Sequence, residues 1–127
     1  ISLYEQLFEQ IFYTPADDKM FKTKETIDGL KTIITHNFNI TIAQMESKSS
    51  NDTYVKARQL FFTMLYADGY GSLKTIGSLL NKNHATVLHS KLVIQQLYET
   101  KDIKYYSMIN KVIEYYNFHK KLLKIFI

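Results

Sequence analysis

The chain has 127 residues, 46% of them hydrophobic, which suits about one domain with a single apolar core. It contains no cysteine, so disulfide bonds, cysteine-bearing zinc sites and cysteine nucleophiles are excluded, and we expect a cytoplasmic protein. The formal net charge is +4, but the first 35 residues sum to −2 and the remainder to +6.

Four glycines and one proline leave few breaks, and apolar residues recur with helical rather than alternating spacing. We therefore expect an all-α helical bundle. Ser2 and Glu5 form a capping-box pattern at the start of an acidic amphipathic helix that ends near Tyr13. This segment does not resemble a signal peptide, and no apolar run approaches the roughly 20 residues of a membrane span.

Six further helices are predicted in chain order, at residues 25–37, 41–46, 53–66, 73–80, 84–97 and 102–118. Asp52 is expected to cap the third of these and Ser72 the fourth, and Gly69 is expected to end the third in a left-handed conformation. Leu88 and Leu92 are expected to belong to the apolar stripe of helix 84–97.

A tight turn at residues 81–83 joins a short helix to a longer one, which matches a helix-turn-helix. In that motif the second helix enters the major groove, and side chains at its N-terminus meet base edges. Histidine and threonine can form hydrogen bonds there, and methyl groups can pack on thymine. The predicted base-contacting residues are Asn83, His84, Ala85, Thr86 and His89.

The residue order is more specific than the spacing. Residues 83–90 read Asn-His-Ala-Thr-Val-Leu-His-Ser, which resembles the Asp-His-Thr-Thr-Val-Leu-His-Ala motif in the C-terminal DNA-binding domain of the bacterial replication initiator DnaA. Residues 56–60 resemble that domain's Arg-Pro-Arg-Gln-Met stretch, and residues 72–77 its Ser-Leu-Pro-Glu-Ile-Gly stretch. The resemblance extends over residues 27–116 and implies an initiator-type, Trp-repressor-like helix-turn-helix that binds double-stranded DNA.

The resemblance also implies individual roles. His84 would read a base, Ala85 would replace a base-reading threonine, and Arg58 and Gln59 would hold phosphates. Four lysines could add attraction to the phosphates. The predicted phosphate-contacting residues are Lys56, Arg58, Gln59, Lys74, Lys82 and Lys91.

The chain departs from the family in three respects. Ser50 stands where the family inserts an arginine into the minor groove, which predicts weaker and less selective binding there. Asn83 and Ala85 replace an aspartate and a threonine, which alters base readout, although Asn83 can still cap the helix. The 127 residues contain no Gly-x-x-x-x-Gly-Lys-Ser/Thr phosphate loop, so we expect no ATPase activity of their own.

Other chemistries have little support. The four histidines lack metal-ligand spacing, no cofactor motif is present, and no nucleophile, base and orienting group appear together, so we expect no enzyme. The tyrosines at 105, 106, 115 and 116 have helical spacing, which favours core or interface packing over base stacking.

We divide the chain into an acidic extension (1–26), an initiator-like domain (27–118) and a basic, apolar tail (119–127). The expected function is sequence-specific binding of double-stranded DNA, as an ATPase-less replication accessory factor or transcription regulator encoded by a bacterium or phage. A protein partner or self-association could use the N-terminal helix or the tail. The alternative is a protein-interaction module that keeps the fold but binds DNA weakly or not at all; an exposed positive face formed by Arg58, Gln59, Lys82 and His84 would argue against it.

Overall fold

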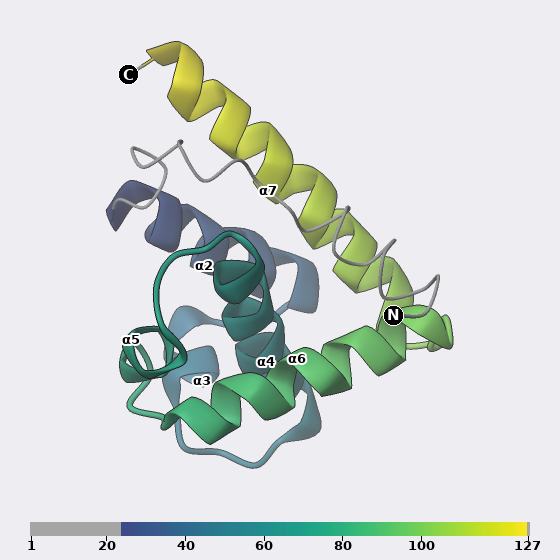
Figure 1. Cartoon of the computed structure of the whole chain (residues 1–127). Helices are drawn as coiled ribbons and strands as arrows, with labels where there is room; N and C mark the ends of the chain where they lie inside the picture. Colours follow the sequence, from purple (N-terminus) through teal and green to yellow (C-terminus); the bar gives the residue numbers. More distant parts are fainter. Residues whose placement is uncertain (1–23, 127) are drawn as a thin grey trace.

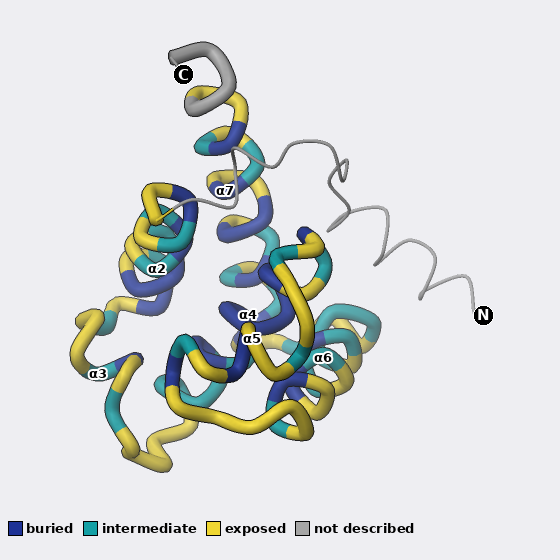
Figure 2. The backbone as a smooth tube through the Cα atoms, turned by 60° about the vertical axis from the view of Figure 1, so that its left-hand side comes forward, coloured by how far each residue is buried: buried dark blue, intermediate teal, exposed yellow. Residues whose placement is uncertain are grey.

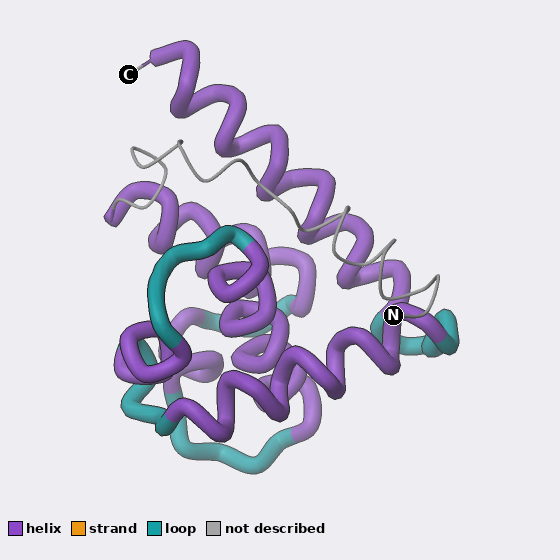
Figure 3. The backbone as a smooth tube through the Cα atoms, viewed as in Figure 1, coloured by secondary structure: helices purple, strands orange, loops and turns teal. Residues whose placement is uncertain are grey.

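The computed structural model describes residues 24–126, with side chains described through Leu122. The predicted helix at residues 2–13 lies outside this range. All regular structure in the described part is helical, which confirms the all-α expectation (Figures 1 and 3). The helices, in chain order, are α2 (Lys24–Phe38), α3 (Ile42–Glu46), α4 (Asp52–Ala67), α5 (Leu73–Ser78), α6 (His84–Glu99) and α7 (Tyr106–Phe126).

Helix α4 forms the centre of the domain, and α2, α3, α5 and α6 all pack against it. Its buried apolar side chains surround most of the helix, as expected for an element covered on several sides. They are Ala57, Leu60, Phe61, Phe62, Met64 and Leu65. Figure 2 shows buried stretches of the surrounding helices in dark blue. Helix α7 packs along α2.

The helix ends follow local capping chemistry. Ser72 caps α5 through its hydroxyl, and Gly69 has φ 68°, both as predicted. The cap of α4 was predicted wrongly: it is Asn51, whose Oδ1 accepts from the N–H groups of Thr53 and Tyr54. Asp52 is the first helical residue, and its carboxylate interacts with other side chains.

Helix α7 also differs from the prediction, since it begins at Tyr106 and runs to Phe126 without ending near Phe118. The stretch that follows Phe118 was expected to be a basic, apolar tail separate from this helix. In the structure Lys120 is only 5% exposed, and its Nζ lies 3.3 Å from Asp68 Oδ1. This ion pair connects the last part of α7 to a residue 52 positions earlier, at the end of α4.

Two tyrosine–aspartate hydrogen bonds connect the last segment of the chain to the two ends of α4. The Tyr105 hydroxyl donates to Asp52 at 2.5 Å, and the Tyr116 hydroxyl donates to Asp68 at 2.7 Å. Both tyrosines are buried, as expected, and burial together with the Asp68 charge raises the pKa of Tyr116 far above its ordinary value. Tyr116 therefore remains a neutral donor.

Candidate nucleic-acid interface

A close backbone approach sets the geometry of the helix-turn-helix. The Lys82 N–H donates to the Gly77 carbonyl at 2.9 Å, and Asn81 adopts φ 57° in the turn. A Cβ atom at Gly77 would lie 2.5 Å from the Lys82 carbonyl oxygen. Glycine is therefore required at this position for α5 and the turn to approach so closely.

The first turn of α6 is capped by Asn83, as predicted. Its Oδ1 accepts from the Thr86 N–H at 3.0 Å and from the Thr86 hydroxyl at 3.2 Å. These two side chains thus hold the helix N-terminus together. His84, Ala85 and His89 are exposed beside them.

Helix α6 has one buried and one exposed face. Val87, Ser90 and Ile94 face the core. Leu88 and Leu92 are 47% and 58% exposed, so the prediction that they join the apolar stripe was wrong. With 3.6 residues per turn they lie below His84, on the face away from the core. This spacing of four from His84 was a signal in the sequence that these leucines belong to the surface of the interface.

A pocket of about 150 Å³ lies between α4 and the start of α6. Arg58, Gln59, Lys82 and Thr86 all line it, so four of the predicted contact residues lie together. Gln59 Oε1 is buried and has no hydrogen-bond partner within the described part of the chain. A buried acceptor is costly to leave unpaired, so this oxygen calls for a hydrogen-bond donor and does not itself suit a phosphate.

Arg58 lines the same pocket, but its guanidinium faces the loop that precedes α4. It donates to the carbonyl oxygens of Met45, Ser47 and Ser49, and the residue is 7% exposed. Burial lowers the pKa of Arg58 from its ordinary value. This arrangement differs from the role expected from the resemblance: in the structure Arg58 holds the loop, and it is not part of an exposed positive face.

The predicted phosphate-contacting lysines differ in their exposure and in their contacts with other side chains. Lys74 and Lys82 are exposed. Lys56 is paired with Asp52 at 3.0 Å, and Lys91 lies over the Tyr66 ring, 5.3 Å from its centroid. The positive charge next to His84 therefore comes chiefly from Lys82. Ser50 is exposed in the loop.

Neither a metal site nor a membrane span is found among residues 24–126. No group of three or more histidine, aspartate or glutamate side chains in this range is placed to hold a metal ion. Within the same range no helix is both long and apolar enough to cross a membrane.

The comparisons with known proteins agree with this motif. The family model described as the bacterial DnaA protein helix-turn-helix matches residues 27–93. The chain is 36% identical over 72 residues to the chromosomal replication initiator protein DnaA of Porphyromonas gingivalis, covering 56% of this chain and 15% of that protein. It is 33% identical over 85 residues to DnaA of Flavobacterium psychrophilum, covering 65% of this chain and 17% of that protein.

The chain spans less than a fifth of the length of these curated relatives. No solved structure matches at a significant level. The family match covers more than half of the chain and includes α5, the turn and most of α6. The chain belongs to the bacterial DnaA helix-turn-helix family.

Proposed function

We propose that the chain binds double-stranded DNA in a sequence-specific manner by placing the N-terminal half of α6 in the major groove. Membership of the DnaA helix-turn-helix family supports DNA binding in general. The observation that carries the specific proposal is the face of α6 on which His84, Ala85, Leu88 and His89 are exposed together. An imidazole can bond to base edges, and the alanine and leucine side chains can contact thymine methyl groups.

The pocket beside α6 supports a backbone contact. The Gln59 amide offers two N–H donors and the adjacent Lys82 a positive charge, a combination that suits a phosphate oxygen. Lys74, Lys56 and Lys91 add non-specific attraction, the last two at the cost of loosening their present contacts with Asp52 and Tyr66. The proposal omits Arg58 as a phosphate ligand because the residue is only 7% exposed and three of its five N–H donors already bind carbonyl groups of the loop.

At the level of process, we propose an accessory factor at replication origins or a transcription regulator. The 127 residues carry no phosphate loop, so DNA binding by this part of the chain proceeds without ATP chemistry of its own. Exposed Leu88 and Leu92 also favour a second candidate, a protein-interaction surface on α6, because apolar side chains on a helix face are typical anchors for a partner.

The test is a binding selection on random duplexes with the wild type and His84→Ala, at about 50 mM and about 200 mM salt. We expect a selected sequence for the wild type and, for His84→Ala, a loss of preference worth about 1–3 kcal/mol at one base position. His36→Ala, an exposed histidine on α2, is the matched control and should change nothing.

Lys82→Ala should instead weaken binding to every sequence and reduce the salt slope by about one. If the wild type binds no duplex at about 50 mM salt, the DNA proposal is wrong and the protein-interaction candidate takes its place.

A further inference from the structure

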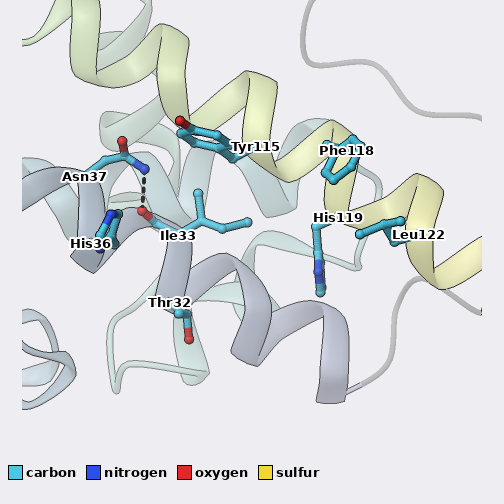
Figure 4. Close-up of a pocket in the computed structure, with 8 residues that line it drawn as sticks. All are labelled: Thr32, Ile33, His36, Asn37, Tyr115, Phe118, His119 and Leu122. Carbon is cyan, nitrogen blue, oxygen red and sulfur yellow. Dashed lines mark hydrogen bonds between the residues drawn. The ribbon is translucent and has the colours of Figure 1, made fainter.

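A second concave surface lies between α2 and α7, away from the helix-turn-helix. It is a groove of about 460 Å³, and Figure 4 shows Ile33 and His36 of α2 opposite Tyr115, Phe118 and Leu122 of α7. It shares no lining residue with the pocket beside α6.

The α7 side of this groove is unusually apolar for a surface. Tyr115, Phe118 and Leu122 are 50%, 59% and 38% exposed. They are spaced at i, i+3 and i+7, so they form one continuous stripe along the helix. A stripe of this kind beside a second helix is the arrangement that receives the apolar face of an amphipathic helix.

We propose that residues 1–13 of the same chain dock in this groove as an amphipathic helix. These residues lie outside the described part of the chain, but their sequence has the pattern of such a helix. Leu3, Leu7, Phe8 and Ile11 fall on one side of a helix, and Glu5 and Glu9 fall on the other. The segment and the α7 side of the groove therefore each present an apolar stripe with helical spacing.

The covalent connection is long enough. Helix α2 begins at Lys24, and the first residue of the groove, Thr32, lies eight residues further, about 12 Å along the axis. Residues 14–23 can span up to about 33 Å when extended. The chain can therefore reverse after residue 13 and lay the segment over the groove.

The charges are complementary as well. Residues 1–23 carry four acidic and two basic side chains, whereas α7 carries four lysines and one acid, Glu114. Lys111 and Lys121 are exposed on α7. The attraction between the excess positive charge of α7 and the excess negative charge of residues 1–23 favours this acidic segment over a basic one.

The absence of cysteine makes the test direct. A nitroxide attached to Ser2→Cys in the full chain reports on its surroundings by broadening nearby amide NMR signals. We expect broadening at Ile33, His36 and Phe118 but not at Leu88 and Leu92 of α6. The broadening should be absent when labelled chains are mixed with unlabelled, isotope-enriched ones, because docking is within one chain.

Phe118→Glu should remove the broadening, and Ile103→Glu, at a fully exposed position in the turn before α7, should retain it. Leu7→Glu changes only the segment and should give the same loss, so the result does not depend on how the folded part tolerates Phe118→Glu.

Broadening of groove amides in the mixed sample would show that a second copy is the occupant. The proposal would be overturned by that result. It would also be overturned if the groove amides showed no broadening at all, or if neither Phe118→Glu nor Leu7→Glu reduced the broadening. Binding of duplex DNA should be unchanged in Phe118→Glu, since the two surfaces are separate.

Discussion

The guanidinium of Arg58 is enclosed by the loop between α3 and α4, where it donates to three backbone carbonyl groups. Arg58→Ala would leave these carbonyls without their donor. We expect a loss of about 1–3 kcal/mol in the free energy of unfolding, measured with urea. Lys48→Ala, an exposed change in the same loop, should cost less than about 0.5 kcal/mol. If Arg58→Ala instead had normal stability but failed to bind DNA, the result would favour a phosphate contact by Arg58 over a role in holding the loop.

Asp52 gives the protein part of its pH dependence. The hydrogen bonds from Tyr105 and then from Lys56 lower the pKa of Asp52 from its ordinary 3.8. A carboxyl with a depressed pKa stabilises the fold above its unfolded pKa, and this contribution is lost as pH falls through the folded value. Asp52→Asn should therefore lower Tm at pH 7 and have a smaller effect at about pH 3. A difference that stays constant or grows on acidification would contradict this explanation.

Residues that act locally were the most predictable from the sequence. The Asn83 and Ser72 caps and the positive φ of Gly69 follow from the chemistry of neighbouring residues, and each was confirmed. Arg58 and Lys120 were not predictable in this way. Their partners lie 9–13 and 52 positions away, so a charged residue that appears suited to the surface is buried by distant parts of the chain.

At the scale of elements, Gly77 determines how closely α5 approaches the start of α6. In Gly77→Ala the new methyl group would meet the Lys82 carbonyl at 2.5 Å and force the turn outward. We expect a loss of about 1–3 kcal/mol in stability and weaker duplex binding, measured by urea unfolding and a binding titration. Gly71→Ala is the matched control, because its Cβ would lie 3.4 Å from Thr75. Equal behaviour of the two variants would refute the role of Gly77.

The positions of most helices could be predicted from apolar spacing, but which of their side chains are exposed could not always be predicted. The sequence predicted α2 to α6 within about two residues at most ends, because each carries a cap or a breaker. Whether Leu88 and Leu92 are buried depends on which side of α6 packs against α4. The packing side is set by the whole bundle and cannot be predicted from α6 alone. The same holds for the candidate site, since the pocket formed by Gln59, Lys82 and Thr86 combines two helices and the turn.

At the scale of the whole molecule, α7 packs against α2 with the ring of His119 directly over Gly29. A Cβ atom there would lie 2.2 Å from His119 Nε2. Gly29→Ala should force the His119 ring to move and lower the free energy of unfolding by about 1–3 kcal/mol, measured with urea. His119→Ala removes the obstructing ring, so Gly29→Ala combined with His119→Ala should be more stable than additivity predicts. Additive losses would show that the contact does not limit the packing.

The central claim is that α6 is the surface that meets DNA, and an NMR titration of the isotope-labelled chain with its selected duplex tests it most directly. We predict that amide signals of residues 82–92 shift or broaden. The groove residues 32–37 and 115–122 should keep their positions. Shifts confined to the α2–α7 groove, or none in α6 at a duplex concentration that saturates binding, would contradict the account.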